Sequence, residues 1–524
     1  MNKIFSIILV GLLLFSGLGL PVSSLHSDFL DNQQPEKIEE YSISQEFNIH
    51  YSEKFVSLSI EGESGFLSIP SQPLLPKITK VFTYPIGTKI KDIDIDCITK
   101  EFDLAKKIQP APQPIPKNKY ISSNILSEKP SFDNELYESE QTFPSFPYTI
   151  RQGVGLNDNN EHVIYLKIEY YTQYLPAHDV VIIPEKVNVN VTYESSTCSF
   201  FDAEEYDLLI ITDELFKEDL LPLVDHKNSI NINTKLETVQ NILPQYEGRD
   251  DAEDVKLFIK DAIEKWGIKY VLLAGGRKGQ SYEWYVPSRR SNNDGSNWES
   301  GYESDLYFAD IYKMVDDDIV FEDWDSNGND IFAEWSYFSD KRDTMDYYPD
   351  VHIGRLPFRY PFEVTSVVNK IIDYENNAND SWFKDAVVVA GDTFPPCRGA
   401  PMDHVYEGEV VTNLTATLLE DVGFDVQRLW LSRNAWKSPE DVIPVLNQGS
   451  GFVHFAGHGN PASWGNHPPD DTEHIVYDGL SVFDMKNFEN IGKLPITVVG
   501  GCHNAQFNVT IKNLPKIISQ YGFL

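Results

Sequence analysis

The alternation of apolar and polar positions changes near residue 200 and divides the chain into two regions. Before that point the pattern has a period of two and many turn residues, as in "KFVSLSIEGESGFLSIP" (54–70) and "KVNVNVTYESS" (186–196). Such alternation is typical of short antiparallel strands with one buried face. We therefore predict a β-rich domain over residues 25–200, interrupted by the proline-rich connector "IQPAPQPIPKNK" (108–119).

From residue 206 onward, continuous apolar runs alternate with segments of helical periodicity. The runs are "YDLLIITDELF" (206–216), "KYVLLAGG" (269–276), "DAVVVAGD" (385–392) and "GFVHFAGHG" (451–459). Runs of this kind are expected of parallel strands that are covered on both faces. The pattern predicts an α/β fold with a mostly parallel, doubly wound sheet. We divide this region into two α/β subdomains, residues 205–360 and 361–524.

The first 24 residues are predicted to be a secretory signal peptide. They combine Lys3 with an apolar run from Ile4 and end on the small residues Ser23 and Ser24. Cleavage there would send the mature chain outside the cell or to its surface, and an uncut membrane anchor is the alternative. No later stretch reaches the ~18 apolar residues of a spanning helix, so we expect no membrane-spanning segment in the mature chain.

Charge and cysteine content restrict the partners and the class of protein. The chain has 80 acidic and 43 basic residues, a formal net charge of −37. Nucleic acid and anionic membrane surfaces would repel such a chain, so we expect neither as a partner. Four cysteines in 524 residues are too few for a disulfide scaffold, even in an exported protein.

Three chemically competent side chains follow apolar runs in the second region. Asp392 ends "VVVAGD", His458 follows "VHFAG" and Cys502 follows "ITVVGG". In parallel sheets ligands bind at the carboxyl ends of the strands, where all three residues fall. A thiol becomes a good nucleophile when a neighbouring histidine takes its proton. The backbone N–H groups of Gly459 and Cys502 are candidate donors to a developing oxyanion.

Several motifs in this order resemble those of the gingipain-like cysteine peptidases, which share the caspase-type fold. The resemblance runs from about residue 205 to 515 and rests on the motifs "FIKDAIEKWGIKYVLLAGG", "SDLYFADI", "YPDVHIGRLP", "GFVHFAGHGNPASWG" and "LPITVVGGCHNAQF". The N-terminal region, with "PSQPLLP" followed by "YPIGTKI", is similar to the inhibitory propeptide of that family. The resemblance therefore implies a caspase-like α/β fold preceded by a β-rich, propeptide-like domain.

The resemblance also implies an activity and a set of site residues. Matched motif by motif, the general base falls on His458, the nucleophile on Cys502 and the third, acidic member on Asp392, while the acidic residue of the S1 pocket falls on Asp403 or Glu407. The protein would be a secreted cysteine endopeptidase made as a zymogen, acting on proteins or peptides without an organic cofactor. Its own N-terminal propeptide would be its partner. The family continues for several dozen residues beyond the cysteine, whereas this sequence ends 22 residues after Cys502. Either the sequence is a fragment or the protease fold is incomplete.

A second motif, "DWDSNGNDIFAE" (323–334), matches a calcium-binding loop in full. Oxygen donors at positions one, three, five and twelve surround a hard cation, and glycine at position six permits the turn. The predicted ligands of a structural Ca²⁺ ion are Asp323, Asp325, Asn327, Glu334 and the backbone carbonyl of Asn329. A polar surface turn is the alternative.

Two rival functions stay open at the level of sequence. A zinc hydrolase is conceivable because five histidines and two aspartates cluster near the C-terminus: His454, His458, His467, His474, His503, Asp470 and Asp471. Against it, no H-E-x-x-H motif occurs. The other rival is a non-catalytic, calcium-binding surface module, that is, a truncated peptidase. A thiol alkylator would inactivate only the cysteine peptidase, and a zinc-selective chelator only the zinc enzyme.

Overall fold

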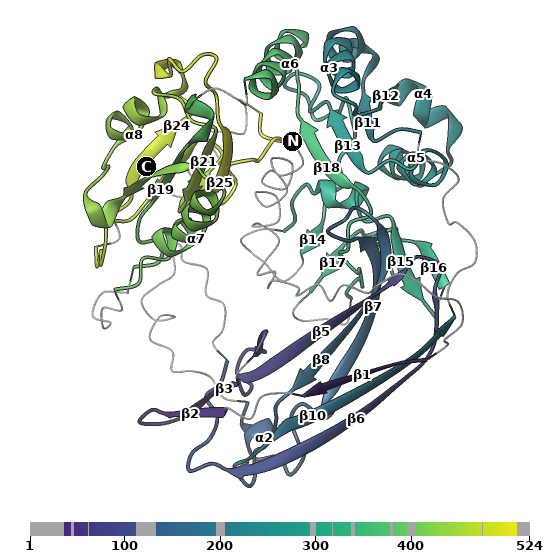
Figure 1. Cartoon of the computed structure of the whole chain (residues 1–524), viewed down its shortest axis with the longest axis vertical. Helices are drawn as coiled ribbons and strands as arrows, with labels where there is room; N and C mark the ends of the chain where they lie inside the picture. Colours follow the sequence, from purple (N-terminus) through teal and green to yellow (C-terminus); the bar gives the residue numbers. More distant parts are fainter. Residues whose placement is uncertain are drawn as a thin grey trace.

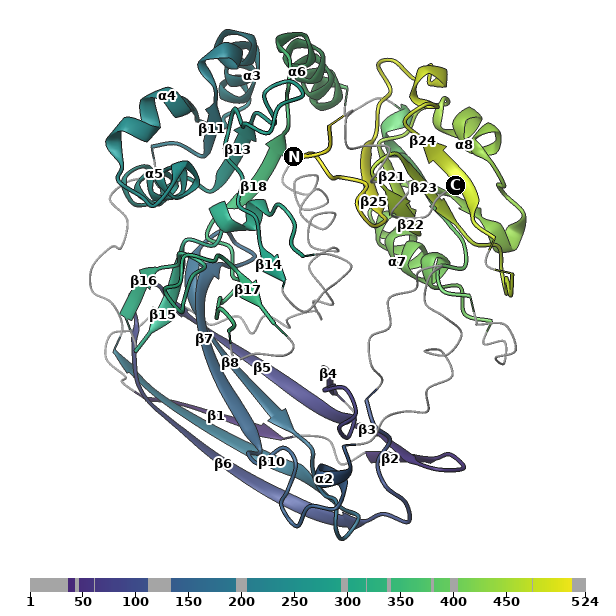
Figure 2. The same cartoon turned by 180° about the vertical axis from the view of Figure 1, so that it is seen from behind.

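The computed structural model arranges the chain in three parts (Figure 1). A β-rich N-terminal domain lies below two α/β subdomains, which stand side by side above it in both views (Figures 1 and 2). The structure describes residues 36–42, 47–60, 62–111, 133–194, 205–293, 300–316, 318–336, 341–377, 381–395, 404–473 and 475–510. The predicted signal peptide therefore lies outside the described residues. No helix in the described ranges is long and apolar enough to cross a membrane.

The N-terminal domain is built from two four-stranded antiparallel sheets that share one core. Its elements are β1 (Glu36–Ser42), β2 (Phe47–Tyr51), β3 (Val56–Ile60), β4 (Gly65–Leu67), β5 (Leu75–Pro85), β6 (Lys89–Asp103), α2 (Asn134–Tyr137), β7 (Tyr148–Leu156), β8 (His162–Tyr171), β9 (Gln173–Leu175) and β10 (Val180–Glu194). Along β10, Val187, Val189 and Val191 are buried and alternate with partly exposed side chains. The period-two pattern therefore marks the buried face, as predicted.

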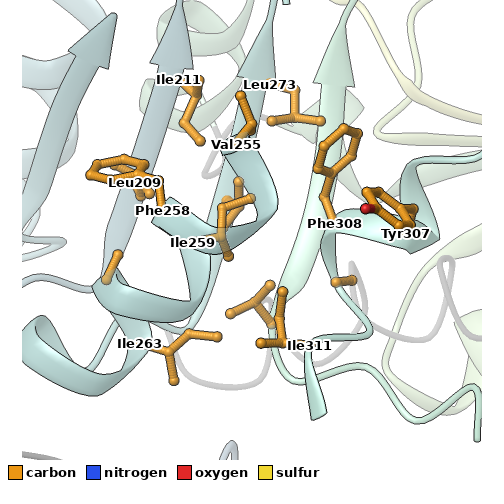
Figure 3. Close-up of a cluster of buried hydrophobic side chains, with 14 of the residues drawn as sticks. Leu209, Ile211, Val255, Phe258, Ile259, Ile263, Leu273, Tyr307, Phe308 and Ile311 are labelled. Atoms are coloured by element: carbon orange, nitrogen blue, oxygen red, sulfur yellow. The ribbon is translucent and has the colours of Figure 1, made fainter. Parts of the chain in front are cut away.

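The first subdomain contains a four-stranded parallel sheet in the order β12-β11-β13-β18. Its elements are β11 (Leu208–Thr212), α3 (Lys217–Ser229), β12 (Thr234–Thr238), α4 (Val239–Ile242), α5 (Asp251–Trp266), β13 (Tyr270–Ala274), β14 (Asn292–Asn293), β15 (Tyr312–Val315), β16 (Asp318–Phe321), β17 (Glu334–Trp335) and β18 (His352–Leu356). The apolar face of α5 packs on the sheet through Val255, Ile259 and Ile263 (Figure 3). The side chain of Asp250 caps its N-terminus, and Gly267 ends it with φ 70°.

The second subdomain contains another four-stranded parallel sheet, in the order β20-β19-β21-β25. Its elements, together with the connecting helix α6, are α6 (Pro361–Asn376), β19 (Asp385–Ala390), α7 (Glu407–Asp421), β20 (Asp425–Trp430), α8 (Pro439–Leu446), β21 (Phe452–Ala456), β22 (His458–Asn460), β23 (Ser463–Asn466), β24 (Tyr477–Ser481) and β25 (Ile496–Gly500). Helix α7 covers one face of this sheet, and α8 contributes to the core on the other face. The parallel α/β fold is confirmed, with one four-stranded parallel sheet in each subdomain and smaller sheets beside it.

Helix α6 packs on the first subdomain although it was assigned to the second. Val364 and Val368 are buried in the same cluster as Leu208 of β11 and Leu220 of α3. Apolar periodicity predicted the helix correctly, but periodicity carries no information about which sheet receives its buried face.

The two parallel sheets have the same topology. In each, the first strand in the sequence lies between the second and the third, and the fourth strand pairs with the third. The order of the strands reverses between the first and third strands of each sheet. Ligands of open parallel sheets bind at such a reversal, outside the carboxyl ends of the strands. In the second subdomain this position lies between the ends of β19 and β21.

The N-terminal domain is joined to the first subdomain by contacts between buried groups. Val154 of β7 is fully buried within the core of that subdomain, and its N–H donates to Asp346 Oδ2 over 3.0 Å. The N–H of Leu156 donates to the carbonyl of Pro349 over 2.8 Å, and Tyr165 stacks on Tyr348 with ring centroids 4.4 Å apart. The two parts therefore share core as well as surface.

Candidate active site

The register of three neighbouring strands places Asp392, His458 and Cys502 at one edge of the second sheet. The last residues of β19, β21 and β25 are aligned across the sheet, Ala390 with Ala456 and Ala456 with Gly500. Each of the three site residues lies two positions beyond its strand end. Neighbouring strands lie roughly 4.8 Å apart, so the three positions are brought close together. In the order of the strands, β21, which precedes His458, lies between β19, which precedes Asp392, and β25, which precedes Cys502.

The imidazole of His458 is oriented by a backbone carbonyl and by two rings. Its Nε2 lies 2.6 Å from the carbonyl oxygen of Thr393. A carbonyl can only accept, so Nε2 carries the proton of this hydrogen bond. The rings of Phe394 and His467 stand edge-to-face to the imidazole, with centroids 5.7 Å and 5.3 Å away. The ring is therefore held in one tautomer and one orientation.

Asp392 lies beneath this edge of the sheet and is 1% exposed. Its Oδ2 accepts the N–H of Asp470 over 2.9 Å, and its own N–H donates to the carbonyl of His467 over 3.0 Å. These bonds hold the loop that follows β23 against the end of β19. The role of Asp392 as the residue that orients His458 stays a prediction. The carbonyl of Thr393, the next residue, makes the contact to the imidazole. Every residue has a backbone carbonyl, so this contact could not be predicted from the sequence.

Cys502 follows β25 and is an exposed, free thiol. The hydrogen bonds between β21 and β25 continue almost to the site residues, because the N–H of Gly457 donates to the carbonyl of Gly500 over 2.8 Å. The residues that precede His458 and Cys502 are thus tied to each other. The backbone N–H groups of Gly459 and Cys502 stay predicted oxyanion donors.

Comparison with known proteins assigns the family. The profile of peptidase family C25 matches residues 202–515. The chain belongs to peptidase family C25. Among curated proteins, none matches the sequence.

Solved structures of gingipains resemble this C25 chain at low identity. A complex of the pro- and mature domains of Porphyromonas gingivalis RgpB is 20% identical, with a TM-score of 0.40, over 58% of each chain. The Arg-specific cysteine proteinase gingipain R is 20% identical, with a TM-score of 0.41, over 60% of this chain and 58% of that one. Gingipain K from Porphyromonas gingivalis, solved in a study of its zymogenic latency, is 14% identical, with a TM-score of 0.26, over 34% of this chain and 97% of that one. This C25 chain therefore spans less than two thirds of the two gingipain R chains.

Two acidic side chains lie near the end of β19, at the edge of the sheet that carries the histidine of the C25 site. Glu407, the first residue of α7, accepts the N–H of Phe394 over 3.0 Å, and Phe394 contacts His458. Asp470 accepts the hydroxyl of Tyr406 over 3.2 Å at the same edge of the sheet. Glu407 was predicted as an S1 candidate, whereas Asp470 was not, because a loop acid far along the sequence is recognised only once the chain is folded. The other S1 candidate, Asp403, lies outside the described residues.

The histidines of the zinc alternative point in different directions. His454 projects from β21 toward α7, where its Nδ1 lies 3.0 Å from Thr415 Oγ1, and burial lowers its pKa to about 4. His467 turns its Nδ1 toward the carbonyl of Ile475 at 2.9 Å. Within the described ranges, no group of three His, Cys, Asp or Glu side chains is arranged to hold a metal ion. His474 lies outside these ranges.

The predicted calcium loop folds around an arginine of the same C25 chain. Arg249 donates to Asp325 Oδ2 over 2.7 Å and to Asp323 Oδ2 over 3.1 Å. Asn329 Nδ2 donates to Glu334 Oε2 over 2.8 Å. Burial favours the neutral form of Asp325, but two backbone N–H groups and the guanidinium outweigh it and lower its pKa. The carboxylates at positions one and three of the motif are therefore compensated by a guanidinium, which would have to move for a cation to bind.

Calcium binding stays a prediction, and thermal melting tests it. We expect Ca²⁺ to raise the melting temperature above that in chelator, because a ligand that binds only the folded state stabilises it. The Arg249→Met variant should widen the difference, since it removes the competing cation. The Asp325→Asn variant should abolish it. Equal melting temperatures with calcium and with chelator, in both the wild type and Arg249→Met, would show that the loop is only a turn.

Proposed function

We propose that this C25 chain is an exported cysteine endopeptidase in which Cys502 is the nucleophile and His458 the general base. One observation carries the proposal: the two residues lie at equal positions beyond adjacent, register-paired strands. The orientation of the imidazole supports the role of His458, because its Nε2–H donates to the carbonyl of Thr393 and this bond holds the ring in place at the edge of the sheet. Export is inferred from residues 1–24 of the sequence.

The reaction follows from these positions. His458 Nδ1 takes the proton of the Cys502 thiol, and the thiolate attacks the carbonyl carbon of the substrate peptide bond. The N–H groups of Gly459 and Cys502 stabilise the oxyanion, and the carbonyl of Thr393 stabilises the imidazolium through Nε2–H. The imidazolium then gives its proton to the leaving amine, so that an acyl-enzyme and a free amine result. Water, deprotonated by the same imidazole, hydrolyses the thioester and restores the thiol.

The acidic groups beside the histidine favour substrates with a basic residue before the cleaved bond. Glu407 and Asp470 lie at the edge of the sheet where such a side chain would enter, and Asp403 is a further candidate from the sequence. An arginine or lysine placed there would gain charge-assisted hydrogen bonds. A neutral side chain would gain no such bonds, and an acidic side chain would be repelled by these carboxylates.

The β-rich domain is proposed to be an inhibitory and fold-assisting prosegment. The change of pattern near residue 200 separates two hydrophobic cores. An exported protease must also be kept inactive until it has left the cell, and an inhibitory prosegment would do so. The stretch from Ser195 to Glu205, which has few structure signals, is the proposed site of cleavage. Because Val154 is buried in the first subdomain, we expect the prosegment to stay bound for a time after the chain is cut.

Processing of the full-length protein tests this proposal. Mass spectrometry should detect cleavage between residues 195 and 205, together with rising labelling of Cys502 by an acyloxymethyl ketone with arginine or lysine at P1. Gel filtration should show the two pieces eluting together at first. The Cys502→Ala protein is the control, and it should neither process itself nor be labelled. A stable precursor that is fully labelled and keeps residues 25–200 would contradict the prosegment role, and would identify a permanent accessory domain.

A further inference from the structure

The side-chain amide of Asn504 connects the loop that carries the thiol to the hairpin that carries the histidine. Asn504 lies two residues after Cys502. Its Nδ2 donates to the carbonyl of Asn460 and to that of Ser463, both over 2.8 Å. These carbonyls belong to the hairpin of β22 and β23, which begins at His458. One amide group thus uses both of its N–H bonds to hold the base's hairpin against the nucleophile's loop.

Two glycines make room for this amide. A Cβ atom on Gly459, next to His458, would collide with Asn504 Oδ1, and so would a Cβ atom on Gly501, next to Cys502. The Cβ of an alanine at Gly501 would also lie only 3.2 Å from Gly459 Cα, which shows how closely the two loops approach. Neither glycine has a positive φ. The glycines are therefore required by the space that Asn504 fills and not by backbone conformation.

The amide acts where the backbone ladder stops. The bonds between β21 and β25 end with the N–H of Gly457 on the carbonyl of Gly500, one residue before His458. Beyond that point the strand pairing ends, because His458 begins β22 and Cys502 lies in a turn. Asn504 supplies two further hydrogen bonds between the loop of Cys502 and the hairpin of His458, so its side chain takes over where the backbone hydrogen bonds of the strands stop.

We propose that Asn504 is a positioning residue that fixes the separation of His458 and Cys502. The inference rests on the function proposed above, because it assumes that these two residues exchange a proton. Asn504 itself touches neither the thiol proton nor the substrate carbonyl in that scheme. Its effect comes from holding the base's hairpin and the nucleophile's loop at one distance, and a misplacement of about 1 Å can lower a rate about 100-fold.

Steady-state kinetics on the full-length protein measure the effect. Asn504→Ala is expected to lower kcat about 10- to 100-fold and to leave KM unchanged, because substrate binding does not use this amide. Asn504→Leu keeps the number and branching of the side-chain heavy atoms but removes both donors and adds volume, so it should lose at least as much. Asn447→Ala is the matched control. Asn447 also ties two segments of this subdomain, through the carbonyl of Asn487 and the N–H of Glu489, and its loss should leave kcat unchanged.

A double variant separates positioning from general loss of structure. Gly459→Ala alone should lower kcat strongly, since its new Cβ takes the place of Asn504 Oδ1. In the Asn504→Ala background the space is free, so the same glycine change should cost little more. Such non-additivity is expected of residues that touch or share one space, and not of distant, independent sites. Equal losses in both backgrounds would overturn the proposal.

Hydrogen exchange provides a readout that does not depend on activity. In Asn504→Ala and Asn504→Leu, the peptides covering residues 457–466 and 500–506 should exchange faster together, while the rest of the sheet keeps its protection. Unchanged exchange in both peptides, or an unchanged kcat in a protein that hydrolyses peptides, would overturn the positioning role. If the wild type hydrolyses no peptide, but both segments exchange faster in the variants, the proposed function is wrong. The role of Asn504 in connecting the two loops would then still hold.

Discussion

Replacing Cys502 by alanine is expected to abolish peptide hydrolysis and to leave the protein folded. The proposed mechanism forms its covalent intermediate on this sulfur, and removing such a nucleophile costs roughly 10⁶-fold in kcat. The thiol is exposed at the end of β25, so the free energy of unfolding should change by no more than about 0.5 kcal/mol. Turnover of a peptide with arginine or lysine before the cleaved bond, measured beside a thermal melt, tests both statements.

The other free thiol within the described residues supplies the control. Cys97 lies on β6 of the N-terminal domain and is half-buried, and burial raises its pKa. A buried, protonated thiol is a poor nucleophile, so Cys97→Ala should keep full turnover. Full turnover in Cys502→Ala would refute the assignment of Cys502 as the nucleophile. Loss of turnover in both variants, with both folded, would point to damage unrelated to the chemistry.

Replacing His458 by alanine should lower kcat by about 10⁴-fold or more while the thiol stays present. Without the imidazole no group receives the thiol proton or returns it to the leaving amine. The hydrogen bond to the carbonyl of Thr393 is also lost, but His458 is partly exposed, so water can enter the space that the imidazole leaves and donate to that carbonyl. We therefore expect a folded, inactive protein whose Cys502 is labelled more slowly by an alkylating agent.

His178→Ala is the matched control for the histidine. Like His458, His178 has a hydrogen-bonding partner, Glu140 at 3.0 Å, but it is exposed and lies in the N-terminal domain. Its loss should change neither kcat nor the rate at which Cys502 is alkylated. If His458→Ala retained the turnover of the His178→Ala protein, another base would have to be sought among the groups near Cys502.

Much of the site was predictable because it follows from strand ends. The apolar runs before Asp392, His458 and Cys502 predicted three parallel strands, and parallel strands place their carboxyl ends at one edge. The partners within that edge were not predictable. Thr393 acts through its carbonyl oxygen, which every residue has, and Asn504 is one polar residue in a polar turn. Their roles exist only because two strand ends lie side by side.

The calcium motif shows how a local pattern depends on its surroundings. The spacing of oxygen donors in residues 323–334 is set by the sequence alone. Arg249, which binds the carboxylates of Asp323 and Asp325, lies more than 70 residues away along the chain. The spacing of the motif identifies the oxygen donors, but it gives no sign of the Arg249 guanidinium that folding brings next to them.

A buried lysine also shows that a local sequence pattern does not reveal which distant groups surround a residue. Lys256 of α5 is fully buried, and burial lowers its pKa to about 8 against the opposing effect of Asp310, Glu322 and Asp350. On a helical pattern a lysine is expected to face solvent. It is tolerated inside because acidic groups from three distant segments surround it, and their attraction offsets part of the cost of removing its charge from water.

The period of the apolar residues predicts the main strands and helices, because burial on one or both faces imposes that period. The same pattern predicts that Asp392, His458 and Cys502 follow strand ends, and that the chain changes from antiparallel to parallel sheet near residue 200. The tertiary structure divides the parallel strands between two separate sheets and packs α6 on the first. It alone brought Thr393 to His458, Asn504 between two glycines and Arg249 to the acidic loop. Periodicity depends on neighbours in the chain, whereas these contacts join residues that are distant in sequence and meet only after the sheets have formed.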